Sequence, residues 1–258
     1  MTDFRAVRTV LQANYFAGFP GQPAKDLVKK NTWDEIQILP EIVSISTSNN
    51  HGKDLQLLSD LCGHWLDILP PEQDVHIKQA CLMAADKLQA STFNALHGYY
   101  QTAVDCLRLA IEQMTIATHN QLCFEHEEGV IVEGRGAASF ETAHDYLRLH
   151  YKETRLWRLF EGERNGIGWI RSLHQTLTDY VYARQDSDAI QVWDGGNGPI
   201  YRKSALESAI RMWLLTYASC AILLRLAQPS TPKVEEIFSN TTVARVVVLK
   251  RAADLLWV

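Results

Sequence analysis

Residues Lys87–Gln121 read KLQASTFNALHGYYQTAVDCLRLAIEQMTIATHNQ and contain no proline. Apolar side chains recur in this stretch at intervals of three or four residues, which is the pattern of a helix with one buried face. Polar side chains, among them Asp105 and Arg108, fall on the opposite face. We therefore expect one long central helix over 87–121, with Leu107 and Ile111 buried in a core. The apolar face consists of Leu96, Tyr100, Ala103, Leu107, Ala110, Ile111 and Met114.

Further helices are predicted on both sides of this stretch, so the expected fold class is all-α. Pro40 is expected to interrupt any helix in residues 24–48, because proline lacks an amide hydrogen and clashes with the preceding turn. Ser91 or Asn94 either caps the central helix or lies where two helical segments join. The prediction is a multi-helix bundle around the long central helix, forming a single helical domain over 1–258. The other expected helices are residues 3–17, 53–69, 71–88, 139–160, 169–181, 203–227 and 242–257.

Residues 124–138 differ in composition from the segments around them. They carry four glutamates and three glycines around the apolar run Val130–Val132. That run could form a small β-hairpin arm, and the alternative is an exposed acidic loop. In either case this segment is the expected position of any boundary within the helical domain.

The composition restricts the function classes. A formal net charge of −5 gives no general attraction to nucleic acid or anionic lipid, so only local basic faces remain for such ligands. The five cysteines are odd in number and widely spaced, which is typical of reduced thiols and not of a disulfide framework. The N-terminus lacks a signal-peptide pattern, and residues 212–224, a strongly apolar run without charge, are too short to span a bilayer. We therefore expect a cytoplasmic protein that does not bind membranes.

His119, Cys123 and His126 are the candidate metal ligands, spaced four and three residues apart. A continuing helix would place them on one face, and imidazole and thiolate are zinc ligands. Cys62 and His64 are the candidates to complete such a site from another helix. The alternative is that these are ordinary helix residues, and we favour it because the spacing does not resemble a paired-ligand module. No metal and no other cofactor is therefore expected.

Arg148, Lys152 and Arg155 follow one another at intervals of four and three residues, so a continuous helix would carry them on one face. A basic face with aromatic residues among the cations can bind a nucleic-acid backbone or a phosphate. The alternative, which we favour, is a solvated face whose cations pair with nearby carboxylates. The aromatic residues are Tyr151 and Trp157, and the carboxylates are Asp145, Glu153, Glu161 and Glu163.

Residues 193–199 form a glycine-rich polar segment that begins with Trp193. A phosphate-binding loop is disfavoured here, because no strand precedes the segment and Pro199 lacks an amide hydrogen. Long polar segments in compact domains are often functional or disordered. We expect part of any contact surface on 124–138 and 193–199, with Trp193 as a binding residue. The alternative is that Trp193 folds back onto the core.

Two stretches together resemble the HEPN class of bacterial helical proteins: LHGYY at 96–100 and LHQTLTDYVY at 173–182. The resemblance extends over roughly half of the chain. It implies a four-helix bundle and a phage-defence setting, because the class includes toxin and phage-defence ribonucleases. Those nucleases use an arginine followed four to six residues later by a histidine. Here Tyr182 stands at the histidine position and Arg171 is only three residues from His174, so the resemblance argues against nuclease chemistry.

The sequence therefore predicts a non-catalytic helical interaction protein, and the resemblance implies that it belongs to a bacterial defence assembly. Its partner is expected to be another protein or a second copy of the chain. The second hypothesis is a HEPN-like ribonuclease or RNA-binding protein that uses the basic face around 148–171. No catalytic residue is assigned. The expected binding residues are Arg148, Lys152, Arg155 and Trp193.

Overall fold

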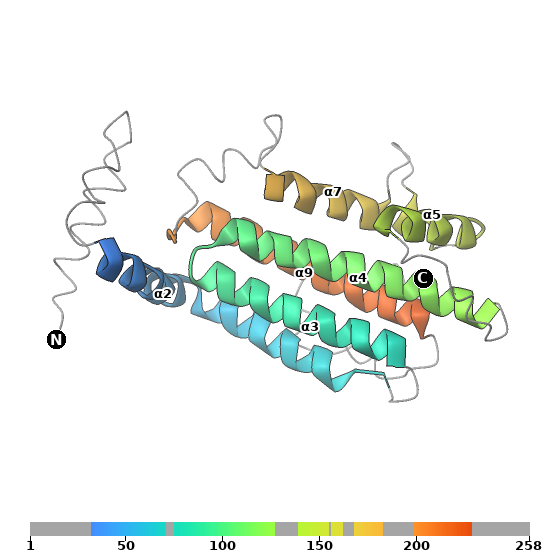
Figure 1. The fold of residues 1–258 in the computed structure, drawn as a ribbon, viewed down its shortest axis with the longest axis horizontal. Coiled ribbons are helices and arrows are strands. Elements are labelled where there is room, and N and C mark those ends of the chain that lie inside the picture. Colours follow the sequence, from blue (N-terminus) through green and yellow to red (C-terminus); the bar gives the residue numbers. More distant parts are fainter. Residues whose placement is uncertain are drawn as a thin grey trace. The chain divides into compact units, whose positions relative to one another are not determined.

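The computed structural model describes residues 32–70, 75–126, 139–154, 156–161, 168–182 and 199–228. All regular structure within these ranges is helical, which confirms the predicted all-α class (Figure 1). The chain divides into two compact units, Met1–Leu39 and Pro40–Val258. In the first unit only residues 32–39 are described, and they are the first residues of helix α2, Thr32–Asp67.

The second unit is a bundle with a central helix, as predicted. Its helices after α2 are α3 (Val75–Leu96), α4 (Tyr100–His126), α5 (Phe140–His150), α6 (Trp157–Phe160), α7 (Trp169–Tyr182) and α9 (Lys203–Ala227). The central helix is α4, which packs against α3, α5, α7 and α9. α3 and α4 form an antiparallel hairpin with α9 beside them, and α5 and α7 cover another side of α4 (Figure 1).

The core of the bundle consists of buried side chains from all of the described helices, with α4 in contact with most of the others. Leu107 and Ile111 of α4 are fully buried, which confirms the prediction made from the apolar face. The bounds of α9 match the helix expected over 203–227. Within the described ranges, α9 is the one helix long and apolar enough to cross a membrane. Of its most apolar 18-residue segment, 72% is buried in the bundle.

Two buried indoles connect α2, α3 and α9. Nε1 of Trp65 donates to the Cys81 carbonyl at 2.9 Å, and Nε1 of Trp213 donates to the Leu88 carbonyl at 3.0 Å. The ring of Tyr217 lies 5.8 Å from that of Trp65 and 5.5 Å from that of Trp213, measured between centroids. A buried indole needs an acceptor for its N–H group, and both acceptors here belong to α3. These contacts hold one side of α3 against the core.

The helix expected over 87–121 is interrupted at residues 97–99, so this prediction is wrong in that respect. Gly98 has a φ of +82°, and the amides of Gly98 and Tyr99 donate back to carbonyls in the last turn of α3. This geometry is a glycine-terminated helix end. A Cβ at Gly98 would lie 2.5 Å from the Ile200 carbonyl oxygen, so glycine also permits the close approach of the segment before α9.

Pro40 lies inside α2, so the expectation that it interrupts a helix in 24–48 is wrong. A proline removes a single helical hydrogen bond, and the turns on either side still form theirs. The departure from helical geometry occurs instead at His51, with φ −132° and ψ 25°.

The helix expected over 139–160 is divided into α5 and α6, so its continuity was predicted wrongly. α5 ends at His150, and Tyr151 at its C-cap has φ −96° and ψ 8°. The ring of Tyr151 is buried and stacks on that of Phe160 at 5.7 Å, with 10° between the planes. The chain turns between these two residues, and both rings thereby reach the same part of the core.

Candidate functional site

The basic face predicted from Arg148, Lys152 and Arg155 does not form one helical stripe. Arg148 is on α5, but Lys152 follows the end of that helix and is exposed. Arg148 lies between two carboxylates, with Nε 3.7 Å from Asp145 Oδ1 and Nη1 3.8 Å from Glu161 Oε2. Arg155 lies outside the described residues.

A further cation of this region, Arg171 on α7, also faces a carboxylate. Its Nη2 is 3.3 Å from Oε2 of Glu141 on α5. The side chains of both partners are largely exposed, and pairs of this kind contribute little to stability. The pairs formed by Arg148 and Arg171 match the alternative of a solvated face whose cations are paired with carboxylates.

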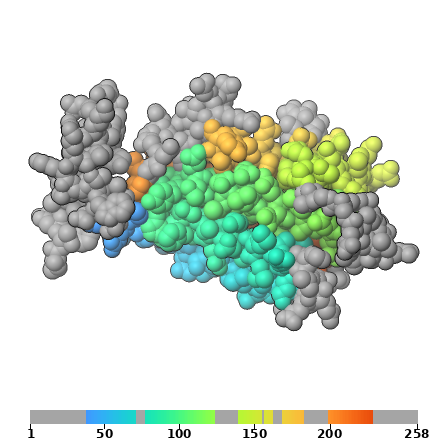
Figure 2. Space-filling model, in the orientation of Figure 1, coloured from blue at the N-terminus to red at the C-terminus, as the bar shows by residue number. Residues whose placement is uncertain are grey.

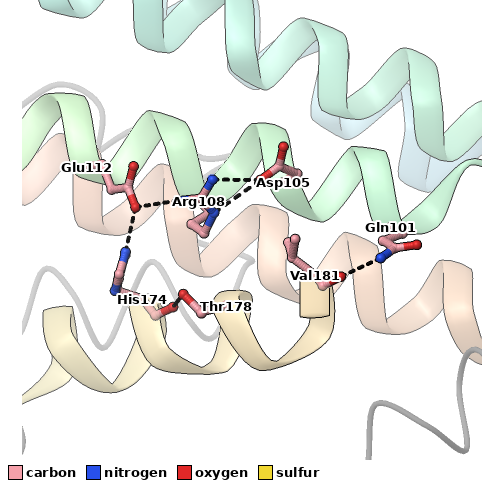
Figure 3. Close-up of polar contacts among 7 residues, drawn as sticks. All are labelled: Gln101, Asp105, Arg108, Glu112, His174, Thr178 and Val181. Atoms are coloured by element: carbon pink, nitrogen blue, oxygen red, sulfur yellow. Dashed lines mark hydrogen bonds and ion pairs between the residues drawn. The ribbon is translucent and has the colours of Figure 1, made fainter. Parts of the chain in front are cut away.

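A second polar arrangement joins α4 to α7 and is shown in Figure 3. We call it the α4–α7 network; its members are Asp105, Arg108, Glu112 and His174. Arg108 donates from Nη2 to Asp105 Oδ1 at 2.9 Å and from Nη1 to Glu112 Oε1 at 2.6 Å. Glu112 Oε1 also accepts from His174 Nε2 at 2.7 Å, although the two residues are 62 positions apart. Farther along the same pair of helices, Gln101 donates to the Val181 carbonyl.

The electrostatics of this network favour an ionised Glu112. Burial raises the pKa of its carboxyl, but the hydrogen bond from His174 and the charge of Arg108 outweigh that effect and lower the pKa below its ordinary value. The Phe140 ring of α5 stacks on the His174 imidazole at 3.8 Å, with 20° between the planes. The Glu112 carboxylate and the Phe140 ring together orient the His174 imidazole, as in a positioned acid–base pair. The hydrogen bond between Glu112 and His174 also holds α7 against α4.

His144 on α5 is a functional candidate that sequence reasoning missed. Its side chain is fully buried, and neither ring nitrogen has a hydrogen-bond partner among the described residues. The ring centroid lies 5.9 Å from Phe140 and 5.8 Å from Phe160. Burial, with a smaller contribution from the charge of Arg171, lowers the pKa of His144 to about 4, so the imidazole is neutral at neutral pH. Its position four residues after Phe140, on the apolar face of α5, is the signal that could have identified it.

The candidate metal ligands are brought together only in part. His119 Nε2 lies 3.5 Å from Cys123 Sγ, and His119 Nδ1 lies 2.9 Å from Asn120 Oδ1. Cys62 is buried in the core, where burial raises the pKa of its thiol to about 11 and so disfavours the thiolate that binds zinc. The side chain of His126 lies outside the described part of the chain. Among the described side chains, no group of three His, Cys, Asp or Glu residues could hold a metal ion.

The outer side of α3 carries large apolar side chains that the bundle does not cover. Leu82 is 46% exposed, Met83 38% and Phe93 61%. We call these three residues the α3 patch. In the space-filling view of Figure 2, α3 is coloured teal and lies at the surface of the molecule. The sequence did not indicate this patch, because the expected helix boundary between 71–88 and 87–121 separated Leu82 from Phe93.

A contact surface was expected on residues 124–138, where a β-hairpin was also considered, and on 193–199 with Trp193. Of these segments, residues 127–138 and 193–198 lie outside the described residues. Their role stays a prediction. Comparison of the chain with protein-family models, with curated proteins and with solved structures gives no match.

Proposed function

We propose that this protein is a non-catalytic helical interaction protein that binds a protein partner through the α3 patch. The observation that supports this proposal is the exposure of Leu82, Met83 and Phe93 on a helix whose other side lies in the core. Covering apolar surface contributes about 25 cal/mol per Å² removed from water. Leu82 and Met83 are adjacent, Phe93 lies farther along the same helix, and large apolar side chains exposed on one side of a helix are candidates for a docking site.

The polar clusters support the same proposal, because their groups are used within the chain. Arg148 and Arg171 lie beside carboxylates, so a phosphate ligand would have to compete with Asp145, Glu161 and Glu141 for them. The α4–α7 network joins two helices through hydrogen bonds between its own members. The RNA-binding hypothesis has less support from these contacts than the interaction hypothesis.

The bacterial defence assembly implied by the HEPN resemblance is the setting in which we would look for the partner. The test is co-purification with the tagged chain, comparing wild type with Phe93→Glu. The matched control is Leu149→Glu on α5, because Leu149 is 62% exposed and Phe93 is 61% exposed. We expect Phe93→Glu to abolish partner binding and Leu149→Glu to retain it, with both melting temperatures unchanged. Equal binding by the two variants would contradict the proposal.

The polar segments are tested in the same assay. Trp193→Ala and a deletion of 129–136 should weaken partner binding at unchanged melting temperature if these segments extend the contact surface. A lowered melting temperature with intact binding would assign them to the fold alone.

A further inference from the structure

Cys123, near the end of α4, differs from the other cysteines in what surrounds its thiol. Cys62, Cys81 and Cys220 are buried, whereas Cys106 and Cys123 are partly exposed. Burial raises the pKa of Cys62 to about 11 and that of Cys81 to about 12. It also raises the pKa of Cys106 and of Cys220. Because the thiolate is the nucleophilic form of cysteine, these four thiols are poor nucleophiles at neutral pH.

The Cys123 thiol is hydrogen-bonded to an imidazole. Its Sγ lies 3.5 Å from Nε2 of His119, one helical turn earlier on α4. The other ring nitrogen of His119, Nδ1, lies 2.9 Å from Oδ1 of Asn120. An amide oxygen only accepts, so Nδ1 carries the hydrogen and Nε2 of the neutral ring is an acceptor. Nε2 is therefore in position to take the proton of the Cys123 thiol.

The His119 ring is also oriented from a second helix. Tyr146 on α5 meets it edge to face, with 4.8 Å between the ring centroids and 87° between the planes. Asn120 and Tyr146 together thus limit how the imidazole rotates. A thiol, a base within hydrogen-bond reach and a group that orients the base form the arrangement that activates a cysteine nucleophile.

The pair of His119 and Cys123 lies beside the contact between α4 and α9, and not within it. Thr118 donates from Oγ1 to the Leu223 carbonyl of α9 at 3.2 Å, and Leu122 is buried. His119 and Cys123 each follow one of these α4 residues directly, so they project about 100° around the helix from them. Both members of the pair remain partly exposed, so a small molecule in solution can reach the Cys123 sulfur.

We propose that Cys123 is a modification site that undergoes thiol–disulfide exchange with a low-molecular-weight disulfide, with His119 as its general base. The proposal is independent of the α3 patch, because neither residue belongs to that surface. A base beside the thiol suits a disulfide as co-reactant, since the protonated imidazole can return the proton to the sulfur that leaves.

The exchange balances without any further reactant. The Cys123 proton passes to His119 Nε2, and the thiolate attacks one sulfur of the small disulfide. The bond between Cys123 Sγ and that sulfur forms as the original S–S bond breaks. The second sulfur leaves with the bonding electron pair and takes the proton from the imidazolium. The Cys123 sulfur is thereby oxidised to a mixed disulfide, and one small thiol is released in reduced form.

The first experiment is incubation of the folded full chain with oxidised glutathione at neutral pH, followed by intact-mass and peptide analysis. We expect one glutathionyl group to be added to the 29.2 kDa chain, on Cys123. Cys123→Ser should take up none at the same rate. Cys106→Ser is the matched control and should react as wild type does, because Cys106 is the other partly exposed cysteine of α4. Faster modification of Cys106 than of Cys123 would overturn the proposal.

The second experiment tests the base. His119→Phe keeps a ring beside Tyr146 but has no nitrogen to accept the proton, so the rate of mixed-disulfide formation should fall roughly 100-fold, as expected for a lost general base. An unchanged rate at unchanged melting temperature would overturn the role of His119.

The exposed Asn120 tests the same base without touching the fold. Asn120→Ala removes the group that orients the imidazole and should slow the reaction less than His119→Phe does. Asn120→Asp retains an oxygen acceptor for Nδ1 and should react close to the wild-type rate. Equal rates in Asn120→Ala and Asn120→Asp would contradict a positioning role for Asn120.

Discussion

The α4–α7 network and the α3 patch differ in whether their side chains have partners within the chain. In the network, Glu112 accepts from Arg108 and His174 within one chain. In the patch, Leu82 and Phe93 are 46% and 61% exposed. The sequence predicted charged residues as part of the binding surface, but Arg148, one of them, lies beside two carboxylates of its own chain. The contact surface is better sought where apolar groups lack cover, because water solvates a charge well and an alkyl or phenyl group poorly.

The largest effect on stability is expected in α4, the central helix that contacts both α3 and α7. Leu107 on α4 is fully buried, so Leu107→Ala should lower the free energy of unfolding by about 2–5 kcal/mol, through lost burial and a cavity. Urea denaturation of the variant and wild type measures this difference. A change below about 0.5 kcal/mol, as found at exposed positions, would contradict the central position of α4.

A pH dependence is expected from His144, which lies beside the network without a hydrogen bond. Its folded pKa of about 4 is below the ordinary value of 6.5, so the fold disfavours the charged imidazole. The stability is therefore complete above the ordinary pKa and is lost as the pH falls from there toward the folded pKa. The full loss is about 3 kcal/mol, at roughly 1.4 kcal/mol per pKa unit.

Urea denaturation at about pH 7 and about pH 5 measures the larger part of this loss, since pH 5 still lies above the folded pKa, and His144→Leu is the matched variant because leucine has no titrating group. The variant should retain its stability across this interval. Glu112 does not interfere there, because a lowered carboxyl pKa costs stability only at pH values below its ordinary range. An unchanged pH dependence in His144→Leu would show that other groups cause it.

Removing the shared acceptor of the network should have a moderate effect. Glu112→Ala leaves Arg108 and His174 partly buried without their carboxylate, which we expect to cost about 1–3 kcal/mol. The control is Glu207→Ala, which removes an exposed partner 3.7 Å from Lys203 and should cost at most about 1 kcal/mol. If the two variants lose equal stability, the network does not clamp α7 to α4.

The smallest effect is expected on partner binding when the basic residues are changed. Arg148, Lys152 and Arg155 replaced together by glutamate should leave binding of the protein partner within experimental error, because these residues are not part of the α3 patch. RNA mobility-shift and cleavage assays of the same variant provide the contrast. RNA binding or cleavage by wild type that the variant loses would favour the HEPN-like ribonuclease or RNA-binding hypothesis.

Apolar spacing predicted helix bounds and buried residues correctly where the helix ends depend on nearby residues and many neighbours cover the helix. The α9 bounds and the burial of Leu107 and Ile111 follow from apolar spacing alone. The same spacing failed at Gly98, which looked like an interior helix residue. Its positive φ accompanies a close approach by Ile200, about a hundred residues away, and no local pattern contains that contact.

The sequence by itself predicted the all-α class that the described residues show, and which face of α4 is buried, because helix periodicity is a property of neighbouring residues. The tertiary structure decided which faces are covered. It paired Glu112 with His174, buried His144 between two phenyl rings, and left Leu82 and Phe93 on one open side of an uninterrupted α3. The physical reason is that an apolar stripe specifies that a helix must pack, whereas the segment that covers the stripe lies far away in the sequence.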